Sequence, residues 1–375
     1  MNVEVDAVSG KAQPLGTFGQ VSTPIILDCD PGIDDALAIA FATASPAIDL
    51  IGLTTVAGNV SLDKTTANAL AVASFVGAKD VPVTPGAAAP LLRPALHAEH
   101  VHGDSGLGGA VLPASARAAE DGHAVDYLIE RLGAARGEIT LVATGPLTNI
   151  ALALTREPRL ATWVKDFVIM GGSAGRGNVS HAAEFNIWAD PEAAAITFRA
   201  GWTVRMIGLD VTMRAQATFA VQERMRGLGA LGSQLLLPAL AQYRSSVYEP
   251  GEPPVHDVCA IVSIADPTVF SYTPALVQVE THGTLTSGMT VTDFTPSASH
   301  NTQVAMAVDA DRFWATVLDA YSTLPVAAAL TGGFYHPERN PAPVLVASTR
   351  RKGSAVSTII SCAWTACSST STRSQ

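Results

Sequence analysis

Four carboxylates stand close together in an otherwise apolar stretch near the start of the chain. The segment Ile26-Leu-Asp-Cys-Asp-Pro-Gly-Ile-Asp-Asp-Ala-Leu-Ala-Ile39 contains Asp28, Asp30, Asp34 and Asp35. Burying unpaired charge is unfavourable, so carboxylates that cluster in such a segment need a positive partner. A helix N-terminus supplies only about half a positive charge, whereas a divalent cation would neutralise several acids at once.

Each acid taken alone also has a structural interpretation. Asp34 and Asp35 could stabilise the positive end of a helix dipole, with Gly32 making the tight turn before it. For Asp28, a structural role as a strand-end hydrogen-bond acceptor has the same weight as a functional one. These roles explain Asp30, Asp34 and Asp35 together poorly, because the repulsion among three neighbouring carboxylates is left uncompensated. The pattern therefore favours a metal site.

The type of ligand indicates which metal ion would bind. The candidate ligands are carboxylate and carbonyl oxygens, and no Cys or His has suitable spacing. Hard oxygen ligands suit calcium or magnesium. Calcium fits better if the site must also hold water and substrate hydroxyls, because Ca²⁺ accepts about six to eight oxygens in loose geometry.

The acids lie within an alternation of strand and helix patterns that begins at residue 23. Short apolar runs predict buried strands at 25–30, 50–56, 139–144, 167–170 and 204–209, and helical patterns occupy 34–43, 62–76, 125–135 and 191–199. Continuously apolar strands that alternate with helices are typical of a parallel sheet covered on both faces. Residues 276–284 and 303–308 alternate more and predict antiparallel strands. We therefore expect an α/β fold with a single open, mostly parallel sheet, helices on both faces and antiparallel edge strands near the C-terminus.

Neither an internal repeat nor an interdomain linker interrupts this pattern. We expect one catalytic domain over residues 23–340. Residues 1–22 are mixed and irregular and are predicted to form a flexible extension. Residues 341–375 introduce basic charge and then a Ser/Thr-rich segment, which predicts a flexible tail without an assigned function.

Composition narrows the range of partners. The chain has 375 residues. Its formal net charge of −10 argues against nucleic acid as the main partner, and its 48% content of hydrophobic residues provides ample material for a core. No apolar run is long enough to cross a membrane, and the N-terminus lacks a signal-peptide pattern. Cys29 and Cys259 indicate reduced core thiols rather than a disulfide framework. We expect a cytoplasmic protein with no membrane partner.

In open α/β sheets, ligands bind beyond the carboxyl ends of the strands, so the polar residues at those ends are informative. Residues at or just after the predicted strand ends are Asp30, Asn59, Thr144, Met170 and Asp210, and the following loops carry Asn178, Glu184 and Asn186. Although they are far apart in sequence, parallel strands would bring them to one rim of the sheet.

Several motifs together resemble a known family. Asp28-Cys-Asp30-Pro-Gly-Ile-Asp34-Asp35-Ala closely resembles the N-terminal fingerprint of the nucleoside hydrolases, also called inosine-uridine-preferring nucleoside N-ribohydrolases. Further motifs follow in the family's order: Thr55-Val-Ala-Gly-Asn59, Thr144-Gly-Pro-Leu-Thr-Asn149, Met170-Gly-Gly, Ala183-Glu184-Phe-Asn186, Asp190-Pro-Glu-Ala193 and Val255-His256-Asp257. The resemblance covers roughly residues 24–335, and its acidic motif is far more specific than a glycine-rich loop.

The resemblance implies calcium-dependent hydrolysis of the N-glycosidic bond of ribonucleosides, which releases ribose and the free base. It implies that calcium is bound by Asp30, Asp35, the backbone carbonyl of Thr144 and Asp257. It implies that the ribose is held by Asp34, Asn59, Asn178, Glu184, Asn186 and Asp257, with Met170 also at the sugar. Asp30 is the implied base, which takes a proton from calcium-bound water.

Departure of the base needs a proton donor, because an anionic purine or pyrimidine leaves poorly. His256 is the expected donor. The family has a His that matches His102 near the base, so His102 is expected to assist leaving-group binding. His97, His100 and His102 together would also allow a zinc cluster, but His97 and His100 are expected to be exposed loop residues.

A helix is expected at 234–248, in the region that contacts the base in the family. Its candidates for base contacts are Gln242, Tyr243 and Tyr248, and the preference between purine and pyrimidine is left open. Family members are commonly dimers or tetramers, so the resemblance also implies a homo-oligomer.

Two other functions are compatible with parts of the sequence. The pair Asp28-Cys-Asp30 superficially fits another metal-dependent hydrolase, such as a phosphatase, but Pro31-Gly32 follows and no phosphate-cradling loop or suitable downstream Lys is found. A catalytically inactive nucleoside- or calcium-binding protein is the second alternative. The presence of both Asp30 and His256 argues against it, because binding alone requires neither a base nor an acid.

Overall fold

The computed structural model of the protein describes residues 22–248, 250–326, 347–352 and 355–360. The chain divides into two units, residues 1–327 and 328–375. Of the predicted N-terminal extension, all but Ser22 lies outside the described residues. Of the predicted tail, the structure describes an antiparallel pair formed by β10 (Ala347–Lys352) and β11 (Ala355–Ile360), and the rest lies outside the described residues.

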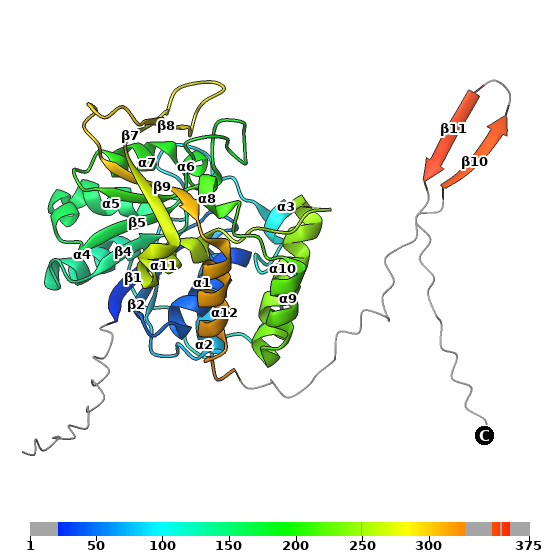
Figure 1. Cartoon of the computed structure of the whole chain (residues 1–375), viewed down its shortest axis with the longest axis horizontal. Helices are drawn as coiled ribbons and strands as arrows, with labels where there is room; N and C mark the ends of the chain where they lie inside the picture. Colours follow the sequence, from blue (N-terminus) through cyan, green and yellow to red (C-terminus); the bar gives the residue numbers. More distant parts are fainter. Residues whose placement is uncertain (1–21, 249, 327–346, 353–354, 361–375) are drawn as a thin grey trace, which may run out of the picture. The chain divides into compact units, whose positions relative to one another are not determined.

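The first unit is built on one nine-stranded sheet, with strand order β3-β2-β1-β4-β5-β6-β9-β7-β8 (Figure 1). The strands are β1 (Thr23–Cys29), β2 (Ile48–Thr55), β3 (Val83–Pro85), β4 (Thr140–Ala143), β5 (Asp166–Met170), β6 (Val204–Ile207), β7 (Phe270–Val279), β8 (Thr290–Asp293) and β9 (Thr302–Val308). The seven strands from β3 to β9 in this order are parallel, and β7 and β8 add antiparallel pairings at the edge. The predicted fold class is confirmed.

One strand differs from its predicted place. Residues 303–308 were expected to pair antiparallel at the edge, but β9 lies inside the sheet, parallel to β6 on one side and antiparallel to β7 on the other. The antiparallel edge is the β7–β8 pair. Alternating hydrophobicity reports how a strand is covered and not the direction of its neighbours, so the sequence pattern could not distinguish these arrangements.

Helices cover both faces of the sheet (Figure 1). In β1, Ile25 and Leu27 belong to one buried cluster, whereas Ile26 between them belongs to the other. Successive side chains of a strand point to opposite faces, so β1 is buried on both sides, as its continuous apolar run predicts. The helices that contribute to the first cluster include α1 (Ile33–Ala44), α2 (Leu62–Val76), α10 (Leu237–Tyr243), α11 (Asp257–Ala265) and α12 (Ala310–Tyr321). Those that contribute to the second include α4 (Ala124–Ala134), α5 (Thr148–Arg156) and α7 (Pro191–Phe198).

Helix α1 carries two of the candidate acids and lies deep in the core. Every residue from Ile33 to Ala42 is buried, which is typical of a helix packed on all sides. Asp34 and Asp35 occupy its first turn, where negative charge interacts favourably with the helix dipole. The Gly32 N–H donates to Asp35 Oδ2 at 3.0 Å, so this side chain also satisfies a backbone group before the helix.

Several shorter helical segments complete the first unit. They are α3 (Glu99–His102), α6 (Phe185–Ala189), α8 (Leu209–Thr212), α9 (Phe219–Arg226), the 3₁₀ segments at Pro158–Thr162 and Pro267–Val269, and the π-helical segments at Leu231–Leu236 and Arg244–Tyr248. The helix expected at 234–248 is therefore α10 with a π-helical segment on either side. Across the described parts of the chain, no helix combines the length and the apolar character needed to span a membrane.

Replacement of the aromatic contact behind α1 should destabilise the protein strongly. Phe41 is fully buried and packs edge-to-face on Tyr321 of α12, with ring centroids 6.5 Å apart. Phe41→Ala should lower the free energy of unfolding by about 3–5 kcal/mol, because it removes buried area and leaves a cavity. Tyr321→Phe should lower it by only about 1 kcal/mol, because it removes one hydrogen bond, to the Leu37 carbonyl. Denaturant unfolding measures both values, and equal losses would contradict this account.

Candidate active site

The carboxyl ends of the central parallel strands carry the predicted polar residues. Asp30 follows β1, Asn59 follows β2, Thr144 follows β4, and Met170 ends β5. All four are buried. Because these strands are adjacent and parallel, their ends meet at one rim, as the sequence predicted.

Asn59 links the acid after β1 to the first turn of α1. Its backbone N–H donates to Asp30 Oδ2 at 2.7 Å. Its side-chain amide donates to the Asp30 carbonyl and to Asp35 Oδ2, each at 3.1 Å. Thr144 holds the second oxygen of Asp35, since its hydroxyl donates to Oδ1 at 2.9 Å. The ends of β1, β2 and β4 are thus joined by hydrogen bonds to two carboxylates.

Two glycines allow this close packing around Asp30. A Cβ atom at Gly58 would lie 2.0 Å from Asp30 Oδ2, and a Cβ atom at Gly145 would lie 2.7 Å from Asp30 Oδ1. Both distances are far below van der Waals contact, so any larger residue would displace the carboxylate. The loops after β2 and β4 must therefore be free of side chains where they pass Asp30.

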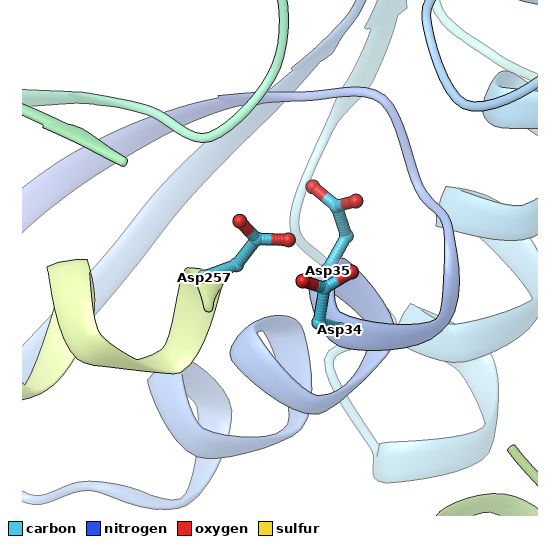
Figure 2. Close-up of side chains that lie close together, drawn as sticks. All are labelled: Asp34, Asp35 and Asp257. Carbon is cyan, nitrogen blue, oxygen red and sulfur yellow. The ribbon is translucent and has the colours of Figure 1, made fainter. Parts of the chain in front are cut away.

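Three carboxylates form a compact acidic cluster (Figure 2). Asp34 and Asp35 come from α1, Asp257 comes from the first turn of α11, and each offers a carboxylate oxygen within 4.8 Å of the others. All three are buried. Burial, followed by the negative charge of Asp35, raises the pKa of Asp34 to about 7. Burial and the neighbouring carboxylates likewise raise the pKa of Asp257 well above its usual range.

The residues of this cluster fit a hard divalent cation. Three carboxylates converge, and Asp30 Oδ1 is buried with no hydrogen-bond partner among the described residues. Burial and the charge of Asp35 raise the pKa of Asp30 well above its usual range, so the ionised carboxylate needs a positive partner. A cation bound by oxygens would supply it. The cluster contains Asp35 and Asp257 of the predicted ligand set and also Asp34, which was predicted to bind ribose.

A second group of polar residues lies at the ends of β4 and β5. Asn186 donates from its side-chain amide to the carbonyls of Thr144 at 2.8 Å and Met170 at 3.1 Å. The Glu184 carboxylate caps α6, accepting from the backbone N–H groups of Asn186 and Ile187. Burial raises the pKa of Glu184 to about 7. These buried residues lie together, as the sequence predicted.

Asn178 lies differently from the other predicted sugar-binding residues. Its side chain is exposed on the loop before α6, and Oδ1 accepts the Phe185 N–H at 3.0 Å. The amide nitrogen is therefore the end of this side chain that is available to a ligand.

The two predicted base-side histidines are buried and face a shared tyrosine. The Ile33 N–H donates to His102 Nδ1 at 3.1 Å, and His256 Nδ1 lies 2.8 Å from the Thr212 hydroxyl. The Tyr243 ring is centred 5.8 Å from the His102 ring and 6.2 Å from the His256 ring. Burial lowers the pKa of His102 to about 3 and that of His256 to about 4, so both imidazoles are neutral at pH 7.

The remaining candidates from the sequence fall into different settings. Gln242 is half-buried and donates to the Ser246 hydroxyl at 2.8 Å, and the side chain of Tyr248 lies outside the described residues. His100 is exposed, as predicted, but it lies in helix α3 and not in a loop. His97 was also predicted to be an exposed loop residue, but it is half-buried and bonded to the Gly58 carbonyl at 3.0 Å. The loop packs against the sheet rim, which its turn-rich composition did not indicate.

The Asp28 side chain has a structural role, because it accepts hydrogen bonds that join neighbouring segments of the fold. Its Oδ1 accepts from the Thr54 hydroxyl at 2.5 Å and from the Asn149 amide at 2.8 Å. Asn149 also donates to the Thr55 carbonyl and accepts the Ala87 N–H. Asn149 belongs to the Thr144–Asn149 motif, and its position near the start of the helix that follows β4 is the sequence signal for this role.

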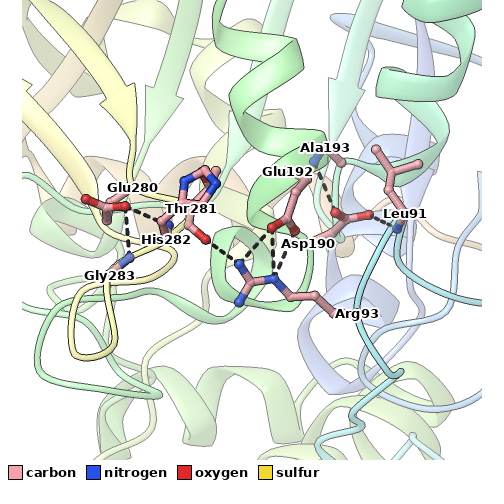
Figure 3. Close-up of polar contacts among 9 residues, drawn as sticks. All are labelled: Leu91, Arg93, Asp190, Glu192, Ala193, Glu280, Thr281, His282 and Gly283. Carbon is pink, nitrogen blue, oxygen red and sulfur yellow. Dashed lines mark hydrogen bonds and ion pairs between the residues drawn. The ribbon is translucent and has the colours of Figure 1, made fainter.

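The segment between β3 and α3 is fixed by contacts that sequence reasoning missed (Figure 3). The Leu91 N–H donates to Asp190 at 2.9 Å. Arg93 forms a bidentate ion pair with Glu192 of α7 and donates to the Thr281 carbonyl at 2.7 Å. Such a pair is geometrically specific, because two parallel hydrogen bonds fix the guanidinium plane. The segment that leads to His97 and His102 is thus held against α7 and the turn after β7.

The sheet and the acidic cluster at its strand ends define an α/β protein of the class that binds small molecules and hard cations beyond the carboxyl ends of parallel strands. The family model described as inosine-uridine preferring nucleoside hydrolase matches residues 25–315. The chain belongs to this family and is an N-ribohydrolase, an enzyme that acts on N-glycosyl bonds.

Individual relatives agree with this assignment. The chain is 46% identical to the inosine-uridine preferring nucleoside hydrolase of Leishmania major over 303 residues, 79% of this chain and 96% of the relative. It is 42% identical to the pyrimidine-specific ribonucleoside hydrolase RihA of Escherichia coli O9:H4 (strain HS) over 296 residues, 78% of this chain and 95% of the relative. The solved purine-preferring ribonucleoside hydrolase from Gardnerella vaginalis superposes with a TM-score of 0.76 at 35% identity, covering 80% of this chain and 99% of that one.

The acidic cluster predicts how stability depends on pH and metal. The folded carboxylates with raised pKa values bind protons more tightly than they do in the unfolded chain, so their contribution to stability is lost as pH rises through about 7. A bound cation should offset this loss.

Thermal unfolding at pH 6.5 and 8.5, with chelator or with excess Ca²⁺, measures the effect. The midpoint in chelator should fall between pH 6.5 and 8.5, and Ca²⁺ should raise it more at the higher pH. The two histidines act in the opposite direction and mainly below this window, because their lowered pKa values reduce stability as pH falls through about 6.5. A Ca²⁺ effect that is equal at both pH values would contradict the cluster as the binding site.

Proposed function

We propose that the protein is a calcium-dependent hydrolase of ribonucleosides, which releases ribose and the free base. The observation that carries the proposal is the buried cluster of Asp34, Asp35 and Asp257 beside Asp30, whose Oδ1 has no hydrogen-bond partner among the described residues. Relatives are named for inosine-uridine, pyrimidine and purine preferences, so the family does not by itself select one base.

The charge at the site suits the chemistry of an N-glycosidic bond. Breaking this bond builds positive charge on the sugar in an oxocarbenium-like transition state. Preorganised carboxylates stabilise such charge without having to rearrange. Asp30, Asp35, Asp257 and the Thr144 carbonyl are the proposed ligands of calcium, which when bound would supply a water with a lowered pKa.

Asp30 is the proposed base. Its Oδ2 is occupied by the Asn59 N–H at 2.7 Å, whereas Oδ1 is left to accept a proton. The backbone at Gly58 and at Gly145 passes close to the two carboxylate oxygens, which limits rotation of the carboxylate. A base with one hydrogen-bonded oxygen and one oxygen without a partner among the described residues presents its lone pairs in a defined direction, as proton transfer requires.

The polar residues at the rim are proposed to bind the ribose hydroxyls. They are Asp34, Asn59, Asn178, Glu184, Asn186 and Asp257, with Met170 at the sugar. Glu184 and Asn186 are already ordered by backbone hydrogen bonds, so little side-chain entropy would be lost on binding. A deoxyribonucleoside would leave buried polar groups unpaired, and the site should therefore discriminate against it.

His256 is the proposed donor to the leaving base, and His102 is proposed to assist leaving-group binding. Burial lowers the pKa of His256 to about 4, so its protonated form is a better proton donor than an ordinary imidazolium but is a minor species at pH 7. The neutral ring can still donate a hydrogen bond from one nitrogen. Either form would lower the cost of placing negative charge on the departing base.

An assay of ribose release tests the proposed activity. The protein is incubated with uridine, inosine and cytidine, with and without chelator, and Asp30→Asn is compared with wild type. We expect release that chelator abolishes, and a decrease in kcat of about 10²–10⁴-fold for Asp30→Asn, because the base is lost. Asp49→Asn, at an exposed acid of β2, is the matched control and should retain activity.

The same assay, extended to phosphate monoesters, separates the alternatives. Nucleoside binding without ribose release would indicate an inactive binding protein. Phosphate release from monoesters without ribose release would indicate another metal-dependent hydrolase. Full activity in chelator would contradict the metal requirement.

The role of His256 predicts a dependence on the leaving group. His256→Ala should impair hydrolysis of inosine and uridine much more than hydrolysis of a nitrophenyl riboside, whose leaving group departs without a proton donor. Steady-state kcat/KM on both substrates measures the ratio. Equal losses on both would remove His256 from leaving-group activation.

A further inference from the structure

His97 is connected by hydrogen bonds to Asp30, the proposed catalytic base, through one peptide unit. Its Nδ1 lies 3.0 Å from the Gly58 carbonyl oxygen. A carbonyl oxygen only accepts, so Nδ1 must carry the proton and donate. The ring is half-buried, which shields this bond partly from competing water.

The acceptor belongs to the peptide unit that supports Asp30. The Gly58–Asn59 peptide presents its C=O to His97 and its N–H to Asp30 Oδ2, at 2.7 Å. The peptide is planar, so fixing the direction of its oxygen also fixes the direction of its hydrogen. A donor on the carbonyl also polarises the unit and strengthens its N–H as a donor.

This peptide needs an external support because it begins at a glycine. Gly58 has no room for a side chain, since a Cβ would lie 2.0 Å from Asp30 Oδ2. Glycine leaves the backbone free to adopt other orientations, including one with the peptide reversed. His97 opposes that reversal, together with the neighbouring bond from the Ala98 N–H to the Asn59 carbonyl at 2.9 Å.

We propose that His97 is a positioning residue for the hydrolysis, and that it orients the Gly58–Asn59 peptide so that Asn59 holds Oδ2 of Asp30. The role rests on the proposed function of Asp30 as base. His97 does not touch the substrate in this role and acts only through the peptide. Its contribution should therefore appear in kcat rather than in KM.

Three substitutions at one position separate positioning from packing. His97→Phe keeps a ring and removes the donor. His97→Asn keeps a donor, because the amide nitrogen of Asn takes the place of Nδ1. His97→Gln is polar but places its amide nitrogen one bond further, at the position of Nε2. His100→Phe is the matched control, because His100 is exposed three residues later, in helix α3.

We expect His97→Phe and His97→Gln to lower kcat on inosine or uridine about tenfold, with KM changed by less than about twofold. His97→Asn should recover kcat to within about twofold of wild type, and His100→Phe should not change it. Wild-type kcat in both His97→Phe and His97→Gln, or an equal loss in His97→Asn, would overturn the proposal. If His97→Phe does not fold, the kcat values of His97→Gln and His97→Asn are compared instead, and equal values would overturn the proposal.

A measurement independent of turnover keeps this proposal distinct from the proposed function. The Asn59 amide should be protected from hydrogen exchange in wild type and in His97→Asn, and should exchange faster in His97→Gln, as followed by NMR. Equal exchange in all three proteins would overturn the proposal. A wild-type protein without ribose release but with this exchange pattern would instead refute the proposed function alone.

Discussion

The repulsion among buried carboxylates is the constraint on which the rest of the site depends. Asp34, Asp35 and Asp257 converge at the rim of the sheet with Asp30 beside them, and burial and their mutual charge raise their pKa values. Backbone and side-chain donors reach only some of their oxygens. Burying these carboxylates together destabilises the folded protein, and a bound cation would offset this cost. The cluster therefore indicates a binding function and not a contribution to stability.

Two buried helices of the fold bring these acids together and restrict their movement. Asp34 and Asp35 lie in the first turn of a helix that is buried on all sides, and Asp257 lies in the first turn of another. These two helices pack against each other. Buried helices move little, because dense packing resists small displacements. Oxygen ligands carried by such helices are therefore preorganised.

Sequence reasoning identified this centre because its signals are local. Asp30, Asp34 and Asp35 lie within one motif, and the rule that ligands bind at strand ends brought Asn59, Thr144 and Asn186 to the same rim. The direction of β9 and the burial of His97 were missed for a different reason. Both depend on contacts with residues distant in the chain, such as Gly58 for His97. Hydrophobic periodicity within a segment does not report such contacts.

Burial affects the two sides of the site in opposite ways. It favours the neutral form of every titratable group, so it raises the pKa of Asp34 and Glu184 and lowers that of His102 and His256. A cation would restore the negative charge of the carboxylates but would keep the histidines neutral, because like charge disfavours imidazolium. Negative charge would then be confined to the proposed sugar side, where positive charge would develop, and the proposed base side would offer neutral donors. One buried site would in this way present different chemistry to the two halves of a nucleoside.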